Sequence, residues 1–213
     1  MGERRTACIF LNGDPPNKKI IDAVIADSSF VVCADGAANY LKKMRITPNI
    51  IIGDLDSITP PTAAFYKTKI PILKNPDQET TDFEKCLIYC QKNNYTTIAV
   101  LGFSSAHADH TLGNYSTLKR YYRRLSVTLV DNIFYISFIP GQTSFSYKTK
   151  EIISLLALPT ASGITTTGLQ YPLRNETLAF GARDGTRNTA VRPRVTIKFK
   201  SGHLLLFKKH FII

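Results

Sequence analysis

The sequence lacks features that would assign it to several common classes of protein. None of its apolar runs approaches the roughly 20 residues that a membrane-spanning helix needs. The N-terminal residues MGERRTACIF contain no apolar signal core, so we expect no export signal and a cytoplasmic protein. The cysteines show neither CxxC spacing nor paired histidines, which argues against a zinc site. We expect Cys8, Cys33, Cys86 and Cys90 to be reduced core thiols.

Three motifs of nucleotide and hydrolase chemistry are also missing. The sequence has no GxxxxGK[ST] loop, no GxGxxG after its first strand-like run and no GxSxG elbow. These absences exclude a P-loop nucleotide hydrolase and argue against a dinucleotide-dependent oxidoreductase and a serine hydrolase.

Acidic residues are scarcer than basic ones, 16 against 27, which gives a formal net charge of +11 at pH 7. A positive surface would suit either a nucleic acid or a polyphosphate substrate. Four of the lysines, at 198, 200, 208 and 209, are spread along the wet face of a predicted terminal hairpin. The net charge alone therefore does not distinguish a nucleic-acid partner from a polyphosphate substrate.

Up to about Asp131 short apolar runs alternate with helix-like segments. Runs rich in β-branched residues predict strands, and apolar positions three or four apart predict helices. Strands are predicted within 6–13, 30–36, 49–57, 69–75, 96–102 and 126–131, and helices within 36–44, 81–93 and 110–125. We expect residues 1–131 to form an α/β domain with a mainly parallel sheet and helices on both faces.

Residues 132–213 read as successive strands without a convincing helix, so we expect a small all-β sandwich domain. Ser201-Gly202 lies between two alternating runs and predicts a hairpin turn. Val195, Ile197 and Phe199 would face the core of this domain.

Polar residues beside glycine follow four of the predicted strands. They occur at Asn12-Gly13, Asp35-Gly36, Gly53-Asp54, and at Gly102 leading on to Asp109. In open α/β sheets ligands bind beyond the carboxyl ends of the strands. Glycine permits tight turns there and lets backbone amides approach phosphates.

The segment GDLDS, residues 53–57, is the most informative of these strand ends. If the segment is extended, Asp54 and Asp56 point to the same side and converge on one cation. Carboxylate oxygens suit magnesium, which then bridges nucleotide phosphates. The alternative is an acidic turn in which these side chains bond their own backbone.

Two further loops carry candidate residues. Asp77, Gln78, Glu79 and Asp82 crowd one strand-to-helix loop, where Gln78 has no capping role. Thr81 and Glu84 match a capping box, and Asp82 would also be favoured simply by the helix dipole.

In the last predicted helix Asp109 could be an ordinary N-cap, and we interpret His110 as a packing histidine.

Taken together, these motifs resemble the thiamine pyrophosphokinase family. The three most specific are GDLDS, TDFEKCL and DHTLGN. In the family's order, the matching stretches are 9–15, 34–41, 48–58, 77–87, 101–114, 168–173 and 178–181.

The resemblance implies a catalytic α/β domain, then a β-sandwich that binds thiamine, in a homodimer with active sites between subunits. It implies transfer of the β- and γ-phosphates of ATP as one unit to the hydroxyl of thiamine, with Mg²⁺ as cofactor and AMP as product. Such transfer consists mostly of positioning and charge neutralisation.

The resemblance also assigns roles to residues of this sequence. Asp54, Asp56 and Asp82 are similar to the family's magnesium ligands and, with Asp109, form the expected catalytic set. Either Asp109 or Asp54 would accept the proton of the acceptor hydroxyl. The expected ATP-binding residues are Asn12, Gly13, Asp35, Gly36, Gln78 and His107, and the expected thiamine-binding residues are Gln78, Asp82, Asp109, Arg187 and Asn188.

Two departures from the family pattern concern substrate contacts. Ser105-Ala106-His107 stands where family members usually have Gly-Gly-Arg, and histidine is shorter than arginine and only partly protonated at neutral pH. Thr186-Arg187-Asn188 stands where a Ser-Asn pair is expected against thiamine. The candidates to supply the positive charge in place of the family's arginine are Arg4, Arg5, Lys74 and Arg187.

Three other functions remain as alternatives. One keeps the reaction but uses another alcohol, such as a hydroxymethylpterin, and a second is a glycosyltransferase that uses Asp54-Leu55-Asp56 as its metal motif. The third is a basic RNA-binding protein that stacks bases on Phe134, Tyr135 and Phe138. Those aromatics have no lysine or arginine among them, so we expect core packing there and neither a nucleic-acid nor a membrane partner.

Overall fold

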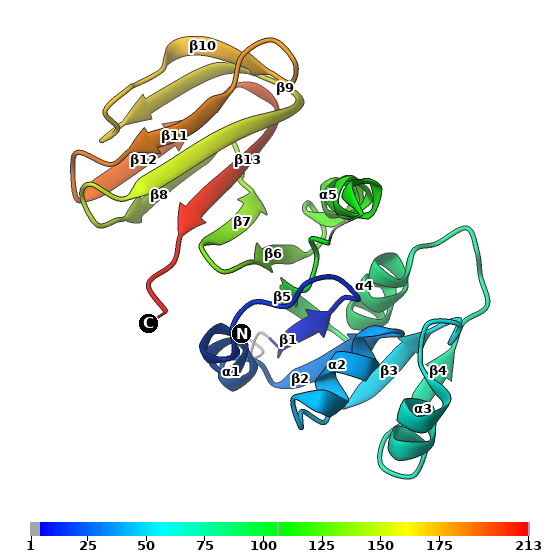
Figure 1. Ribbon diagram of the computed structural model, residues 1–213. Coiled ribbons are helices and arrows are strands. Elements are labelled where there is room, and N and C mark those ends of the chain that lie inside the picture. Colours follow the sequence, from blue (N-terminus) through cyan, green and yellow to red (C-terminus); the bar gives the residue numbers. More distant parts are fainter. Residues whose placement is uncertain (1–4, 106, 213) are drawn as a thin grey trace. The chain divides into compact units, whose positions relative to one another are not determined.

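The computed structural model describes residues 5–105 and 107–212, which fall into two compact units (Figure 1). The first unit extends to Asn132 and the second comprises Ile133–Phe211. No helix in the described part of the chain combines the length and apolar character needed to cross a membrane.

The first unit is built on a parallel sheet with the strand order β4-β3-β2-β1-β5-β6. Its central strands carry apolar side chains that are buried on both faces, as expected for a sheet covered by helices on each side. The strands are β1 (Arg5–Phe10), β2 (Phe30–Ala34), β3 (Ile50–Gly53), β4 (Ile72–Lys74), β5 (Tyr95–Leu101) and β6 (Ser126–Val130).

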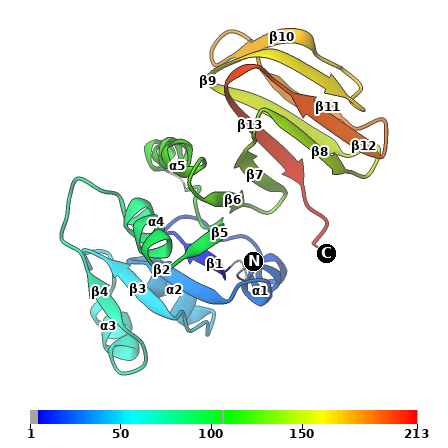
Figure 2. The ribbon, with the colours of Figure 1, turned by 180° about the vertical axis from the view of Figure 1, so that it is seen from behind.

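Five helices connect these strands: α1 (Lys18–Ala26), α2 (Ala37–Lys43), α3 (Pro60–Lys67), α4 (Asp82–Lys92) and α5 (Ala108–Tyr121). Views from opposite sides show α1 and α2 on one face of the sheet and α4 and α5 on the other (Figures 1 and 2). The predicted α/β architecture is therefore confirmed. Helices α1 and α3 were not predicted, because α1 follows Pro15-Pro16 and α3 begins with Pro60-Pro61, and paired prolines favour a loop interpretation.

The second unit contains strands and no helix among its residues. It consists of β7 (Phe134–Phe138), β8 (Gln142–Ser146), β9 (Ile152–Thr167), β10 (Arg174–Ala179), β11 (Gly185–Thr189), β12 (Arg194–Lys198) and β13 (Ser201–Lys209). The long strand β9 pairs antiparallel with β13 and β12 along one edge and with β11 and β10 along the other. One folded sheet thus surrounds an apolar core that includes Ile153, Leu155 and Ile197.

The hairpin predicted at Ser201-Gly202 is wrong. Both residues lie inside β13, and β12 and β13 pair with successive stretches of β9. Gly202 has a φ of +96°, and a Cβ there would collide with the carbonyl oxygen of Thr160. The glycine therefore accommodates an irregular stretch of strand instead of a turn.

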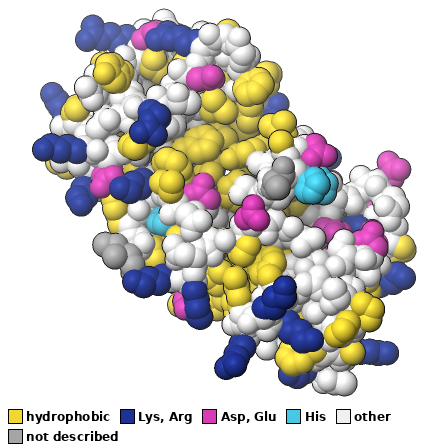
Figure 3. All heavy atoms as spheres, viewed as in Figure 1, with side chains coloured by type: hydrophobic (Ala, Val, Ile, Leu, Met, Phe, Trp, Pro, Cys, Tyr) yellow, Lys and Arg dark blue, Asp and Glu magenta, His cyan; other side chains and the backbone are white. Residues whose placement is uncertain are grey.

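The side-chain burial agrees with two other expectations. The four cysteines are free and buried in the first unit. In the second unit Phe138 is buried, and Phe134 packs edge-to-face on Phe207 with 6.0 Å between ring centroids. Lysine and arginine side chains are scattered over both units on the face shown in Figure 3.

Candidate active site

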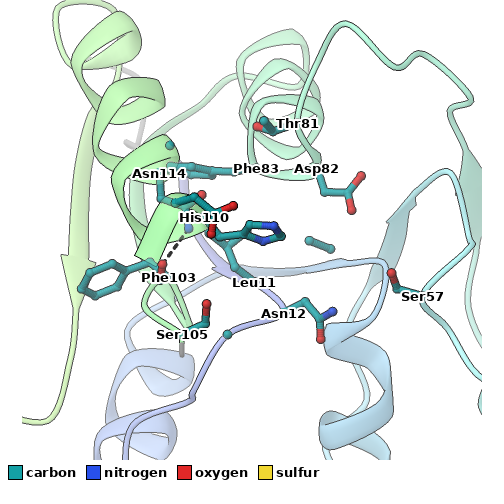
Figure 4. Close-up of a pocket in the computed structure, with 15 residues that line it drawn as sticks. Leu11, Asn12, Ser57, Thr81, Asp82, Phe83, Phe103, Ser105, His110 and Asn114 are labelled. Atoms are coloured by element: carbon teal, nitrogen blue, oxygen red, sulfur yellow. Dashed lines mark hydrogen bonds between the residues drawn. The ribbon is translucent and has the colours of Figure 1, made fainter. Parts of the chain in front are cut away.

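The carboxyl ends of β1, β2, β3 and β5 meet at one edge of the first unit's sheet, next to a cavity of about 390 Å³ (Figure 4). Because parallel strands end at the same edge, residues far apart in the sequence converge there. The cavity is lined by Leu11, Asn12, Gly13, Ala34, Ser57, Thr81, Asp82, Phe83, Gly102, Phe103, Ser105, Asp109, His110, Gly113 and Asn114.

Asp35 follows β2 directly and is only 1% exposed. It fits beside Gly53 because a Cβ on that glycine would lie 2.5 Å from the Asp35 Cβ. The Oδ2 atom of Asp35 accepts a hydrogen bond of 3.1 Å from the Ser57 amide, whereas Oδ1 is buried without a hydrogen-bond partner among the described residues. Burial raises the pKa of Asp35 to about 6, and the charges of Asp82, Asp54 and Asp56 act in the same direction.

Asp54 and Asp56 converge as expected, but the extended segment predicted for them is wrong. Leu55 between them has a left-handed φ of +71°, and the Asp56 amide donates a hydrogen bond of 3.3 Å to Asp54 Oδ1. The segment is an acidic turn of the kind given as the alternative. The turn brings the two carboxylates together with Asp35, so that one ligand atom from each lies within 4.8 Å of the others.

This group of three carboxylates fits a hard divalent cation. It offers one oxygen ligand from each of three side chains within 4.8 Å of one another, and the buried Oδ1 of Asp35 has no other described partner. Magnesium prefers such oxygen donors and keeps several of its ligand positions for water or phosphate.

Gln78 and Asp82 reach the same region from the loop before α4 and from its first turn. The Gln78 side-chain amide donates a hydrogen bond of 3.1 Å to Asp54 Oδ2, which lowers the pKa of Asp54. Asp82 lies outside the group of three, and its Oδ1 accepts a hydrogen bond of 3.2 Å from the ammonium of Lys85. Burial raises the pKa of Asp82 in spite of this partner.

The predicted capping box at the start of α4 is half formed. The Thr81 hydroxyl accepts a hydrogen bond of 3.2 Å from the Glu84 amide, as a cap should. The Glu84 carboxylate instead accepts hydrogen bonds from Tyr121 Oη at 2.9 Å and from Arg120 at 2.7 Å. Both partners belong to the end of α5, so Glu84 links the two helices.

Helix α5 presents a different wall of the cavity. His107, not Asp109, occupies its N-cap position, and the His107 side chain makes no capping hydrogen bond. Asp109 and His110 are exposed and line the cavity, so the proposed packing role of His110 is wrong. Figure 4 shows His110 reaching into the cavity toward the side of Asp82 and Asn12. Its ring centroid lies 5.6 Å from that of His107.

Of the expected ATP-binding residues that lie beside glycine at strand ends, some line the cavity and one supports a residue that does. Asn12 and Gly13 line the cavity, whereas Gly36 begins α2 and packs against the Asn12 side chain. Among the proposed sources of positive charge, Arg5 lies at the amino end of β1 and hydrogen-bonds Tyr95, so it is remote from the strand ends. Arg4 lies outside the described residues.

Arg187 and Asn188 lie in β11 of the second unit. The Asn188 side chain is fixed on the Tyr171 backbone by hydrogen bonds of 3.1 and 2.7 Å. Arg187 is exposed with a left-handed φ of +53°, and its amide donates to Ser154 Oγ. Thr186 and Asn188 line a cavity of about 230 Å³ with apolar walls that include Leu155 and Leu178.

Sequence reasoning missed several residues of the first unit's site. Lys85 gave a signal, since it lies one helical turn after Asp82, but its burial depends on tertiary packing. Ser57 and Asn114 end the GDLDS and DHTLGN motifs, but they were assigned no role of their own. Ser57 acts through its backbone amide, and Asn114 donates a hydrogen bond of 2.6 Å to the Phe103 carbonyl, which fixes the loop after β5.

Comparisons with known proteins point to one family. A family model described as "Thiamin pyrophosphokinase, catalytic domain" matches residues 21–129, and one described as "Thiamin pyrophosphokinase, vitamin B1 binding domain" matches residues 142–204. Thiamine pyrophosphokinase 1 of Arabidopsis thaliana is 30% identical over 80% of this chain and 74% of its own length. Thiamin pyrophosphokinase 1 of Caenorhabditis elegans is 27% identical over 92% of this chain and 86% of its own length.

The fold is also similar to solved structures. The thiamine pyrophosphokinase of Bacillus subtilis superposes with a TM-score of 0.84 at 22% identity, covering 96% of this chain and 99% of that one. The yeast enzyme superposes with a TM-score of 0.83 at 20% identity, covering 100% of this chain and 88% of that one. These likenesses establish a shared fold.

Proposed function

The chain belongs to the thiamine pyrophosphokinase family of diphosphotransferases, and on that premise we propose that it transfers the pyrophosphoryl group of ATP to the hydroxyl of thiamine, releasing AMP. The observation that carries the proposal is the convergence of Asp35, Asp54 and Asp56 beside the 390 Å³ cavity. Pyrophosphoryl transfer needs positioning and charge neutralisation more than covalent help from the protein.

The carboxylates are the proposed metal site. Asp54, Asp56 and Asp82 would hold Mg²⁺, and the position of Asp35 adds it to this set. Bound there, Mg²⁺ would neutralise negative charge on the phosphates of the donor. Gln78 holds one oxygen of Asp54, so the amide sets the orientation of that carboxylate.

The cavity walls are the proposed ATP site. Asn12 offers its side-chain amide at the end of β1, and Gly36 packs against that side chain. Gly13 lets the chain pass close to the loop after β5, where its own amide donates to the Gly102 carbonyl at 2.9 Å. His107 stands where the family has arginine, and its ring centroid lies 5.6 Å from that of His110, which reaches into the cavity. We propose that these two imidazoles together supply phosphate contacts in place of the missing arginine.

The acceptor side is proposed to include Gln78, Asp82 and Asp109 of the first unit and Arg187 and Asn188 of the second. Both Asp54 oxygens already accept hydrogen bonds, whereas Asp109 accepts none from a described residue. Asp109 is therefore the better proposed acceptor for the proton of the thiamine hydroxyl. We further propose that the second unit is a sandwich domain for thiamine binding and dimerisation, and that the enzyme is a cytoplasmic homodimer.

Phosphorus NMR of the protein with ATP, Mg²⁺ and thiamine tests the proposal. We expect AMP and thiamine diphosphate to appear together, and neither to appear with the double variant Asp54→Ala/Asp56→Ala. The control variant Asp22→Ala removes an exposed carboxylate of α1 that pairs with Lys18. AMP formed only with another alcohol, such as a hydroxymethylpterin, would reassign the acceptor. Absence of AMP with every acceptor would refute the reaction.

A further inference from the structure

Lys85 is a buried charged residue for which the proposed reaction provides no role. It lies on the first turns of α4, and its side chain is only 3% exposed. Its ammonium makes one hydrogen bond within the described part of the chain, to Asp82 Oδ1 at 3.2 Å. Lysine is rarely buried unless it is paired, so the role of Lys85 depends on this partner.

The surroundings of Lys85 are strongly acidic. Asp35, Asp54 and Asp56 form the group of three carboxylates, and Asp82 lies near enough to raise the pKa of Asp35. The effect of Lys85 also extends beyond its partner. The pKa of Asp54 is lowered mainly by the Gln78 hydrogen bond, and the positive charge of Lys85 lowers it further. Lys85 is therefore a built-in counter-charge for the carboxylates.

We propose that Lys85 is a positioning residue that competes with a divalent cation for Asp82. In the free protein the ammonium occupies Asp82 Oδ1, and its charge weakens the attraction of the carboxylates for a cation. The negative charge of a bound polyphosphate gives the ammonium a second partner and frees Asp82 for the cation. The cation is thus taken up with the polyphosphate in preference to binding alone. The inference rests on the proposed function for the identity of the polyphosphate.

An ion pair with a purely structural role makes a different prediction. Loss of Lys85 would then loosen the start of α4 and leave cation affinity unchanged or weaker. Under the proposal, neutralising Lys85 removes a repulsive charge and releases a carboxylate oxygen, so both effects tighten cation binding. The sign of the change therefore separates the two roles.

The experiment measures Mn²⁺ affinity by electron paramagnetic resonance in the absence of nucleotide. We expect Lys85→Met and Lys85→Gln each to bind Mn²⁺ tighter by a factor on the order of ten, and Lys85→Arg to stay within about twofold of the native protein. Lys92→Met is the matched control, because it removes the same charge from the exposed far end of α4. Circular dichroism and thermal unfolding establish that each variant is folded.

A second titration adds α,β-methylene-ATP, which binds without transferring its pyrophosphoryl group. We expect the analogue to tighten Mn²⁺ binding more in the native protein than in Lys85→Gln. If the folded neutral variants bind Mn²⁺ no tighter than the native protein, the inference is wrong, whatever the AMP assay gives. A native protein that makes no AMP but shows the expected Mn²⁺ affinities would refute only the proposed reaction.

Discussion

Helices α4 and α5 each bring an aspartate of their first turn to the same cavity, yet their starts are built differently. The start of α4 is fixed, since the Thr81 hydroxyl caps it and the Asp82 carboxylate is held by the buried Lys85. The start of α5 has no side-chain cap, and Asp109 is exposed without a hydrogen bond to any described residue.

We propose that the two helix starts, which form two walls of the cavity, have different roles in the reaction. A metal and phosphate site gains from ligands that are preorganised before the substrate arrives. A residue that takes a proton from an acceptor gains from an unoccupied oxygen that faces the cavity. The first description fits the capped backbone at the start of α4, and the second fits Asp109.

Replacing Asp82 or Asp109 by asparagine should show the difference between the two helix starts most clearly. We expect both Asp82→Asn and Asp109→Asn to lower kcat by about 10² to 10⁴-fold. Asp82→Asn should also lower the free energy of unfolding by about 1–3 kcal/mol, because Lys85 remains buried without its ionic partner. Asp109→Asn should leave stability nearly unchanged. AMP release and thermal unfolding measure the two effects.

The comparison fails if Asp109→Asn is the less stable variant. It also fails if Asp82→Asn retains native kcat, because the aspartate at the start of α4 would then have no catalytic role.

Much of this site could be predicted from local patterns, and the errors are equally informative. The position of Asp54 and Asp56 at a strand end follows from the apolar run before them, but their turn depends on a left-handed Leu55 that no local pattern specifies. Thr81 caps α4 as predicted. The Glu84 side chain does not complete the capping box, because it binds Tyr121 and Arg120, which lie 37 and 36 residues away in the sequence. Contacts at such separations depend on the packing of α4 against α5, which a single sequence does not encode in its local spacing.

The same limit applies to the second unit. The alternation of Val195 and Ile197 identified a buried face, and both are fully buried. The pairing of their strand with β9 instead of β13 is a matter of long-range register, so the local turn signal at Ser201-Gly202 was misleading.

The pH dependence of the free energy of unfolding tests whether Asp82, at the start of α4, affects the pKa of the neighbouring Asp35. The pKa of Asp35 is raised from 3.8 to about 6, so the native state keeps a proton that the unfolded chain releases. Stability should therefore fall by up to about 3 kcal/mol as pH rises from about 4 to 6 in the presence of EDTA. Asp82→Asn should reduce this fall, since the Asp82 charge helps to raise the pKa of Asp35, and Asp109→Asn should preserve it.

Denaturant unfolding at a series of pH values measures this effect, with Asp35→Asn as the variant that should abolish it. A fall of equal size in Asp35→Asn would assign the pH dependence to other groups.

The smallest effect concerns the helix caps themselves. Thr81→Ala should destabilise the protein by about 1 kcal/mol through loss of the hydrogen bond to the Glu84 amide. His107→Ser should instead raise the free energy of unfolding, because the extended backbone at this position (φ −86°, ψ 98°) suits a serine cap that the native helix lacks. Thermal unfolding of the two variants gives the comparison, and a destabilised His107→Ser would show that the histidine already supports the helix.

Glu84 links the start of α4 to the end of α5, far along the helix from the residues of α5 that line the cavity. Its carboxylate holds Tyr121 and Arg120 with hydrogen bonds of 2.9 and 2.7 Å, and separating the helices would break both. The buried hydrogen bond from Tyr121 to the charged Glu84 contributes about 1.5–3 kcal/mol, and the Arg120 pair contributes less because its guanidinium is half exposed. Adaptation to a wider or narrower acceptor is therefore expected in the loops that precede the two helices. Evolution of new acceptor specificity in this chain should proceed by replacing those loops while the helix pair is retained.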